Sequence, residues 1–338
     1  MLFSTESSGM IRIMEPISSI DTSSNQLYFR GLNAVKLARE QDYESVLFLL
    51  VHGQLPTARK HHSIKQRLIK LRALYSPKMN SIESLVKALQ SIRDENDLPL
   101  EELLLALVAL APLALSSQLA ASRSRRMNTQ NEDLGHAANL LWMTNGEVPS
   151  EEEIKEFDTC LILHMDDPDN PSLTALHTSL ISGASVPSAV ESALSEHIKP
   201  SHHGAGLETM RMIFAIGKKD NTSDYIRKRL DAGQRISGLG HRIYQGIDPR
   251  AAVLREILSR RTKGTEGEEL FRIAEEVAER GSSLLHEHKG IRAYPNVDLY
   301  NALTYYTFGL PPELNTELFA VSRTAGWMAH ILEWQQHP

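Results

Sequence analysis

The segment Leu103–Leu115, LLLALVALAPLAL, is the most apolar stretch of the chain. A helix that is hydrophobic on all of its faces is buried either in a protein core or in a membrane. The segment is shorter than the roughly 20 residues that a membrane-spanning helix needs, and it contains Pro112. It therefore predicts a buried core helix, over residues 99–121, around which other elements pack.

Helical periodicity extends from this segment towards both ends of the chain. Asp42 is predicted to cap a helix whose apolar face runs from Val46 to Leu50 and which Gly53 ends. Further helices are predicted at 57–75, 82–93, 133–145, 150–165, 172–183, 187–197, 205–217, 222–231, 249–261, 266–288, 297–308 and 313–335. Period-2 alternation is scarce, and only IRIME and NQLYF predict a short hairpin. The fold class is all-α.

The length of 338 residues allows one large domain or two smaller ones. No linker rich in Pro, Gly or Ser divides the sequence. Glycines nevertheless cluster at 204–206, at 233–240 and at 246, and a Gly-Leu-Pro-Pro turn occupies 309–312. Such points allow the segment 205–311 to move as a unit.

Composition and charge are those of a soluble globular protein, with 41% hydrophobic and 23% charged residues. The formal net charge of −6 argues against a nucleic-acid partner. A single cysteine, Cys160, excludes an intramolecular disulfide, favours a reducing compartment and is expected to be buried. The N-terminal MLFSTESSGMIRIME lacks the long apolar stretch of a signal peptide. We therefore expect a cytoplasmic protein with no membrane partner.

Common cofactor and metal motifs are missing from the sequence, including G-x-G-x-x-G after a strand, the Walker loop, H-E-x-x-H and G-x-S-x-G. His286-Glu287-His288 has no spaced Cys or His partners, so it is interpreted as the polar end of a helix. We expect no metal and no separate cofactor.

In PSHHGAGLETM, His203 directly precedes a predicted helix start at Gly204. The first turn of a helix carries free N–H groups and partial positive charge. A histidine held there stays neutral and is able to donate a hydrogen bond to a developing enolate. The alternative is that His202 and His203 are polar turn residues, and the sequence leaves both interpretations open.

In SGLGHRIYQGIDPR, residues 237–250, His241 follows a Gly-Leu-Gly turn. Asp248 predicts a helix N-cap and Pro249 the first helical position, which places Arg250 in the first turn. A planar guanidinium in that position is able to bind a carboxylate through two parallel hydrogen bonds. A capped helix with an exposed arginine is the open alternative.

Two further charged residues stand out from their surroundings. Asp298 opens a predicted helix in YPNVDLY, where the positive helix start favours the ionised form that a general base requires. It is alternatively a simple stabilising end charge. Arg323 lies in the apolar segment VSRTAGWMAH, where a buried guanidinium needs an anionic partner from the protein or a substrate. Such groups suit proton abstraction beside a carbonyl, with a dicarboxylate as the second reactant.

Several motifs, in order along nearly the whole chain, resemble those of the citrate synthase family. HGAGLE stands where the family has His-Gly-Gly-Ala-Asn-Glu, and SGLGHRIYQGIDPRA is similar to its Gly-x-Gly-His-Arg-Val-Tyr-Lys…Asp-Pro-Arg-Ala motif. LYFRGLNAVKLAREQDYESVLFLLVHGQLPT, NLLWMTNGEVPSEEEIKEFDTCLILHMDD, YPNVDLY and SRTAGWMAH complete the set. The resemblance implies an all-α homodimer in which residues 1–204 and 312–338 form a large domain and residues 205–311 a smaller, mobile one.

The resemblance also implies catalytic roles. Asp298 would remove a proton from the methyl carbon of acetyl-CoA, while His203 donates to the thioester oxygen. Counting from Asn170 makes His202 the histidine that donates to the thioester oxygen. The longer local match from Gly204 onward favours His203 instead. The enol would then attack a keto acid and give citryl-CoA, which is hydrolysed.

For the keto acid, oxaloacetate in the family, the resemblance implies that His241 polarises the keto group and that Arg250 and Arg323 hold the carboxylates. Asn170 matches a residue of the family's substrate loop.

For CoA, the turn Gly238, Leu239 and Gly240 is expected to offer backbone groups, and Arg235 is expected to meet the phosphates. Arg235 and the basic run Arg227-Lys228-Arg229 lie just before the turn, and a solvated helix face is their open alternative.

The acceptor side departs from the family pattern. The family loop reads Asp-His-Glu-x-Asn-x-Ser-Thr, whose histidine contacts oxaloacetate, and here Asp167 replaces that histidine. His177 stands for a family arginine, Gln245 for a lysine and Leu207 for an asparagine. The family tail, whose arginine reaches the oxaloacetate of the partner subunit, has no match after HILEWQQHP.

Three functions therefore remain open. The first is a synthase, with an altered keto acceptor or with propionyl-CoA as in 2-methylcitrate synthase, since one methylene is worth only about 1–3 kcal/mol. The second is a binding or regulatory paralogue, which the changes on the acceptor side favour. The third is a purely structural helical protein, which the retention of His241, Arg250, Asp298 and Arg323 disfavours.

Overall fold

The computed structural model describes residues 2–5, 11–75, 81–95, 97–199 and 204–336. The chain divides into two compact units, of which the first comprises residues 1–20, 27–199 and 317–338. The second comprises residues 21–26 and 200–316. The sequence did not predict that residues 21–26 group with the second unit. The mobility of the predicted smaller domain stays a prediction.

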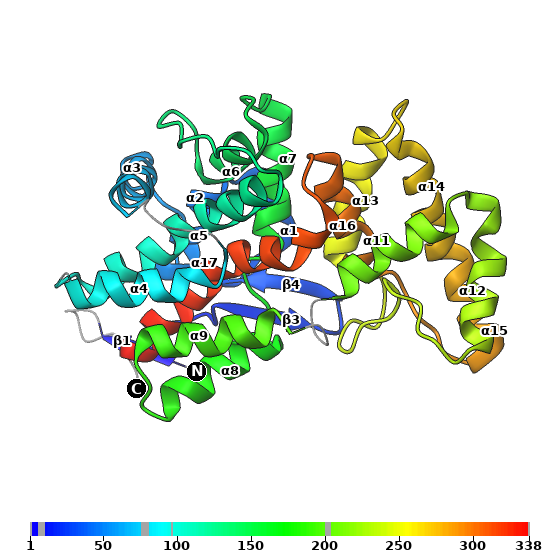
Figure 1. The fold of residues 1–338 in the computed structure, drawn as a ribbon. Coiled ribbons are helices and arrows are strands. Elements are labelled where there is room, and N and C mark those ends of the chain that lie inside the picture. The colour runs from blue at the N-terminus through cyan, green and yellow to red at the C-terminus, as the bar shows by residue number, and fades with distance from the viewer. Residues whose placement is uncertain (1, 6–10, 76–80, 96, 200–203, 337–338) are drawn as a thin grey trace. The chain divides into compact units, whose positions relative to one another are not determined.

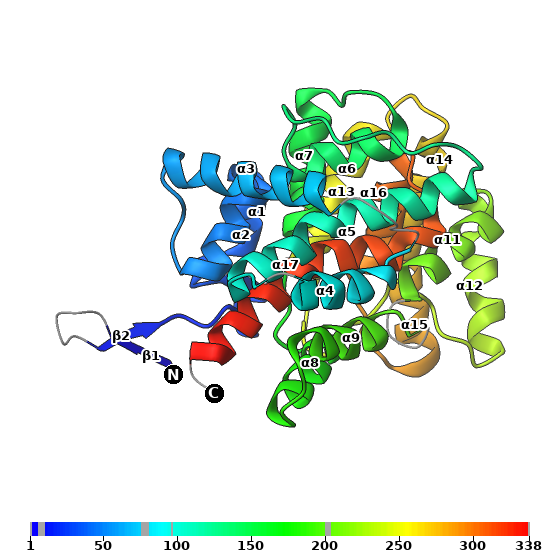
Figure 2. The same ribbon diagram turned by 60° about the vertical axis from the view of Figure 1, so that its left-hand side comes forward.

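The centre of the first unit is α5 (Leu100–Ser122), whose side chains are buried from Leu103 to Ser116, which confirms the predicted core helix. The length argument was wrong, because α5 continues through Pro112 for 23 residues. By length and composition it is able to cross a membrane, but 89% of its most apolar window is buried inside the structure. The helices α3 (Ala58–Leu74), α4 (Ser84–Glu95) and α6 (His136–Asn145) pack against it, and Figure 2 shows α4 beside it.

Other helices surround this core. They are α1 (Ala34–Glu40), α2 (Tyr43–His52), α7 (Glu151–Ile162), α8 (Pro171–Ile181), α9 (Val186–His197) and most of α17 (Asn315–Gln336). In Figure 1, α8 and α9 lie side by side. The Asp42 carboxylate caps α2 by accepting from the Ser45 N–H at 2.9 Å, and Gly53 ends the helix with a φ of 72°. Both ends confirm the prediction.

The few strands pair differently from the predicted hairpin. IRIM forms β2 (Ile11–Met14), which pairs with β1 (Leu2–Thr5). QLYF forms β4 (Gln26–Phe29), which lies between β3 (Ser18–Asp21) and β5 (Leu32–Asn33). The two segments are therefore strands, but they do not pair with each other. Alternation predicts that a segment is extended, whereas its partner depends on the turns on either side.

The second unit is also helical. It contains α11 (Ala205–Ile216), η1 (Lys219–Asn221), α12 (Thr222–Asp231), α13 (Pro249–Arg261), α14 (Gly267–Glu276), η2 (Val277–Gly281), α15 (Ser282–Lys289), α16 (Val297–Thr307) and η3 (Pro312–Leu314). Helix α16 packs against α13 and α11 (Figure 1). The helix predicted at 266–288 is present but contains the π-helical turn η2.

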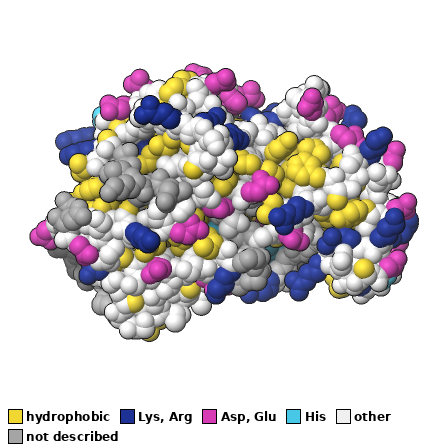
Figure 3. Space-filling view, viewed as in Figure 1, with side chains coloured by type: hydrophobic (Ala, Val, Ile, Leu, Met, Phe, Trp, Pro, Cys, Tyr) yellow, Lys and Arg dark blue, Asp and Glu magenta, His cyan; other side chains and the backbone are white. Residues whose placement is uncertain are grey.

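Acidic and basic side chains are interspersed over the face shown in Figure 3. On the second unit, hydrophobic side chains gather over the ends of α11 and α16. Near the C-terminal ends of α11 and α16, Phe214 and Tyr306 are 47% and 42% exposed and meet edge to face, with ring centroids 5.9 Å apart. Single exposed apolar residues are ordinary on a protein surface.

Candidate active site

His241 is held by the backbone that follows it. Its Nδ1 accepts hydrogen bonds from the N–H groups of Ile243 and Tyr244, at 3.1 and 3.2 Å. The imidazole also packs on the Tyr244 ring, with centroids 4.6 Å apart. A neutral imidazole whose Nδ1 accepts carries its hydrogen on Nε2. His241 is therefore arranged as a donor through Nε2, the form that polarises a carbonyl oxygen.

The Gly-Leu-Gly turn is bonded to the segment that precedes α16. Leu239 and Pro295 form an antiparallel β-bridge. The Asn296 N–H donates to the Gly238 carbonyl at 3.0 Å, and its Nδ2 donates to the Gly240 carbonyl at 2.7 Å. These bonds bring the loop of the predicted carbonyl polariser next to the helix of the predicted base.

This turn needs glycine. Gly238 has a φ of 83° and Gly240 a φ of 85°, a region that other residues rarely adopt. A Cβ at position 238 would also lie 2.9 Å from the Leu299 Cα. The carbonyls of both glycines accept from Asn296, which holds the turn in place. Binding of CoA here stays a prediction, as it does for the exposed Arg235.

Asp298 lies in the first turn of α16, where Asn296 caps the helix by accepting from the Asp298 N–H at 3.0 Å. Burial raises the pKa of Asp298 to about 6, Arg250 lowers it and Asp248 raises it. The helix start was expected to favour ionisation, so the net shift has the opposite sign, because desolvation outweighs the field of the helix. A carboxyl with this pKa is still mostly ionised at pH 7 and is well matched to general-base work.

Arg250 forms an ion pair with the N-cap residue of its own helix. Asp248 caps α13, Pro249 follows it and Arg250 occupies the first turn, as predicted. The Arg250 Nε lies 3.1 Å from the Asp248 Oδ1, and its Nη2 lies 2.9 Å from Oδ2. The two side chains are only 3% and 0% exposed, so the alternative of an exposed arginine is wrong. This pair fixes the position and charge of the guanidinium.

Replacing Asp248 by Asn is expected to lower the free energy of unfolding by about 3 kcal/mol, because it leaves a buried guanidinium without its carboxylate partner. The amide retains an oxygen that caps α13, so the loss reports the charge pair. Urea unfolding measures it. Arg272→Ala, which breaks an exposed i,i+4 pair with Glu268, is the control and is expected to leave the free energy of unfolding nearly unchanged. Equal small losses for both variants would contradict the assignment.

In the first unit, Arg323 is 1% exposed and its Nε donates to the His164 carbonyl at 3.0 Å. The anionic neighbour that a buried arginine requires is Asp166. Burial by itself raises the pKa of Asp166, but His330, Arg323 and Ser18 outweigh it and hold the pKa at about 2. The His330 Nε2 lies 3.0 Å from the Asp166 Oδ2. Asp166 is therefore a permanent carboxylate that balances Arg323 inside this unit.

Asn170 and Asp167 lie in the loop between α7 and α8. The Asn170 Oδ1 caps α8 by accepting from the N–H and the hydroxyl of Ser172, at 3.0 and 2.7 Å. This capping holds the side chain, and contact with a substrate stays a prediction. Asp167 is 9% exposed, and its Oδ1 accepts from the Asp169 N–H at 3.2 Å. A carboxylate therefore occupies the position of the family histidine.

His203 lies outside the described residues, so its predicted role rests on its motif alone. Asn296 and the pair Asp166 and His330 were not predicted from the sequence. An asparagine just before a predicted helix is itself a capping signal, and it would have identified Asn296. The Asp166–His330 contact joins residues 164 positions apart, so no local spacing indicates it.

Among the described residues, no three His, Cys, Asp or Glu side chains lie close enough to hold a metal ion. The second unit contains the donor imidazole of His241, the carboxyl base Asp298 and the paired guanidinium of Arg250, each at a turn or at a helix start. Such a set defines a class of helical protein equipped for polar chemistry beside a carbonyl group.

Comparison with known proteins identifies the family. The family model described as "Citrate synthase, C-terminal domain" matches residues 8–337. A citrate synthase of Haloferax volcanii is 34% identical over 353 residues, covering 96% of this chain and 90% of its own. A citrate/2-methylcitrate synthase of Bacillus subtilis is 27% identical and covers 96% and 91%. The crystal structure of citrate synthase from Thermotoga maritima superimposes with a TM-score of 0.82 at 28% identity, covering 95% and 88%.

The chain belongs to the citrate synthase family, and with it to the acyl-condensing transferases. Its all-α fold is that of the family.

Proposed function

We propose that this protein condenses acetyl-CoA with a 2-keto acid, oxaloacetate or a relative of it, and releases CoA. Membership of the family supports this reaction. The observation that carries it is the arrangement of His241 as an Nε2 donor on a turn that Asn296 bonds to the helix of Asp298. A carbonyl polariser and a carboxyl base are thus held together within one unit.

In the proposed reaction, the Asp298 carboxylate removes a proton from the methyl carbon of acetyl-CoA, and His203 donates a hydrogen bond to the thioester oxygen. The nucleophilic carbon then forms a bond to the keto carbon of the acceptor. The keto oxygen, polarised by His241, takes up a proton and becomes a hydroxyl. Water cleaves the thioester of the product, giving free CoA and, with oxaloacetate, citrate. All of these steps are polar. The proposed reaction therefore uses acetyl-CoA as a substrate and needs no separate cofactor.

For the acceptor, Arg250 and Arg323 are proposed to bind carboxylates, and Asn170 is proposed to contact the acceptor from the loop between α7 and α8. The buried Asp167 is proposed to face the acceptor, as the histidine at this position of the family does. Two unit charges 4 Å apart at an effective dielectric constant of 20 repel by about 4 kcal/mol. This repulsion supports an acceptor less charged than oxaloacetate on the side of Asp167.

The test is the release of free thiol from acetyl-CoA by the purified protein with oxaloacetate, pyruvate, 2-oxoglutarate or glyoxylate. Propionyl-CoA is run beside acetyl-CoA. We expect CoA release that requires both substrates with at least one acceptor. A preference for propionyl-CoA would instead establish the 2-methylcitrate alternative. The name of the Bacillus subtilis relative, a citrate/2-methylcitrate synthase, is the reason for testing it. No release with any pair, together with CoA binding in calorimetry, would establish a regulatory paralogue.

The resemblance to the family also supports a homodimer in the cytoplasm. The single cysteine of the chain, Cys160, is buried and has no second cysteine with which to form an intramolecular disulfide, which suits a reducing compartment. Sedimentation velocity tests the oligomeric state, and a monomer at micromolar concentration would contradict the proposal.

A further inference from the structure

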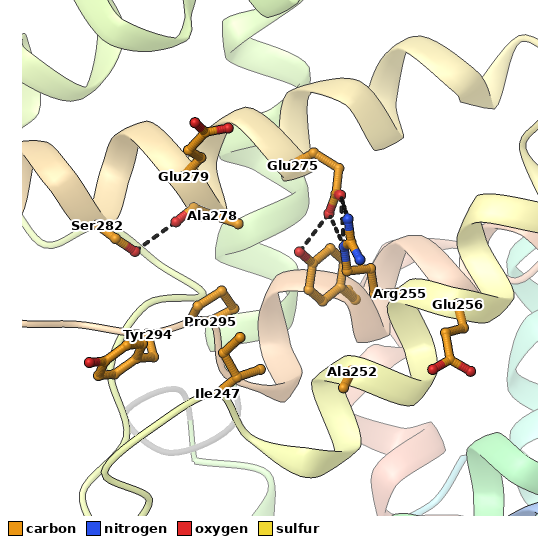
Figure 4. A pocket seen from close by; sticks show the side chains of 11 residues that line it. Ile247, Ala252, Arg255, Glu256, Glu275, Ala278, Glu279, Ser282, Tyr294 and Pro295 are labelled. Carbon is orange, nitrogen blue, oxygen red and sulfur yellow. Dashed lines mark hydrogen bonds and ion pairs between the residues drawn. The ribbon is translucent and has the colours of Figure 1, made fainter.

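The second unit contains a cavity of about 510 Å³, and none of its lining residues has a role in the proposed reaction (Figure 4). Its walls come from α13, α14, η2, α15 and α16, together with the two loops of the Gly-Leu-Gly segment and α16 start. A cavity of this size accommodates a small organic molecule.

The lining of the cavity includes an ion pair. The Arg255 Nε donates to both carboxylate oxygens of Glu275, at 2.9 and 2.7 Å, and the Tyr300 hydroxyl donates to the same carboxylate at 2.7 Å. The three side chains come from α13, α14 and α16, and Figure 4 shows Arg255 and Glu275 facing each other. The positive charge of Arg255 is therefore neutralised by Glu275 before any ligand arrives.

The rest of the charged lining is acidic. Glu256 and Glu279 complete the set of charged residues, so the lining holds three carboxylates and one guanidinium. Glu279 makes no ion pair with another described residue. CoA carries several phosphate charges, which such a lining repels. The lining favours a ligand with a positive charge.

The mouth of the cavity is apolar. Ile247 is 51% exposed and Tyr294 is 40% exposed, and Pro295 lies beside them (Figure 4). An apolar or aromatic body seated here would cover both exposed side chains, and the Tyr294 ring is of the kind that attracts cations over its face. Affinity would come from this burial and from the rim carboxylates together.

The opposite wall is the π-helical turn η2, which supplies Ala278 and Glu279. Single π-turns inside α-helices are frequent at functional sites. Gly281 in this turn touches the Gly-Leu-Gly segment, where a Cβ would lie 2.8 Å from the Leu239 Cδ1. The Ser282 hydroxyl donates to the Ala278 carbonyl at 2.7 Å, which satisfies a backbone group of the turn. This wall of the cavity is therefore formed by a packed helical turn.

We propose that this cavity is a binding site for a small organic cation, a primary amine or guanidinium attached to an apolar or aromatic body, separate from the site of acetyl-CoA.

The test uses the full chain and isothermal titration calorimetry with three probes of one shape. Phenethylamine is cationic, 2-phenylethanol is neutral and 3-phenylpropionate is anionic. We expect 1:1 binding of the amine and at least about tenfold weaker binding of the other two, which corresponds to about 1.4 kcal/mol. No binding of the amine, or equal binding of all three probes, would overturn the proposal.

Two variants locate the site. Glu279→Gln is expected to weaken amine binding by about tenfold, and Ala278→Leu to abolish it by filling the cavity. Glu191→Gln, at an exposed position in α9 of the first unit, is the matched control and is expected to bind the amine normally. The affinity for CoA should be unchanged in all three. Competition between CoA and the amine would overturn the separate site. The readout is binding, so it stands whether or not the proposed reaction is found.

Discussion

Replacing Asp298 by Asn is expected to reduce the release of CoA by about 10²–10⁴-fold, the range that a positioned general base contributes. The amide has nearly the same shape, but it cannot accept a proton from the methyl carbon of the thioester. The loss should therefore fall on kcat, with little change in the KM of acetyl-CoA. Steady-state thiol release measures both constants.

The pH dependence supplies a second readout of the same residue. The base must be ionised, so the rate is expected to fall as the pH drops through about 6, the pKa of Asp298. This pKa is raised above the usual 3.8, so the folded protein binds the proton more tightly than the unfolded chain. The contribution of Asp298 to stability therefore declines as the pH rises from about 4 to 6. At pH 7 the Asn variant is accordingly expected to be no less stable than the wild type.

Asp224→Asn is the matched control, since Asp224 also lies in the first turn of a helix, α12, and its side chain is 79% exposed. It is expected to retain full activity. If Asp298→Asn kept more than about a tenth of the activity, Asp298 would not be the base.

Local chemistry made much of this fold predictable. The order Asp248, Pro249, Arg250 determines a helix start by itself, because each residue type suits one position of the first turn. The uniformly apolar segment of α5 was predictable for the same kind of reason, because a helix that is apolar on all of its faces must be shielded from water. These features depend on neighbours within a few residues, which the sequence displays directly.

What the sequence did not predict depends on distant partners. The pKa of Asp298 results from burial competing with Arg250 and with the helix start, and the extent of burial follows only from the packed unit. The π-turn η2 inserts into a helix whose apolar periodicity looks continuous. The carboxylate that balances Arg323 comes from Asp166, far away in the sequence. In each case the result depends on interactions between residues that are far apart in the sequence.

The acceptor side offers the sharpest test of how this chain differs from its relatives. Asp167→Asn is expected to raise kcat/KM for oxaloacetate by at least about tenfold, towards a ceiling of about 10³-fold if the full repulsion of about 4 kcal/mol is removed. The amide oxygen is still able to accept from the Asp169 N–H, as the carboxylate does at 3.2 Å, so the loop should keep its shape.

Asp167→His, which restores the residue that the family has at this position, is expected to gain as much or more, because an imidazole also donates a hydrogen bond to the acceptor. The gain should be confined to acceptors with a second carboxylate, and pyruvate should show little change, since it has no such group to be repelled. Asp169→Asn is the control, as this carboxylate is exposed two residues away. A gain of equal size for pyruvate and oxaloacetate, or none for either, would show that Asp167 does not face the acceptor's distal carboxylate. A carboxylate at position 167 that repels the acceptor must discriminate between oxaloacetate, which has a second carboxylate, and pyruvate, which does not. Without that discrimination, the selectivity among acceptors would have to arise from Arg250 and Arg323.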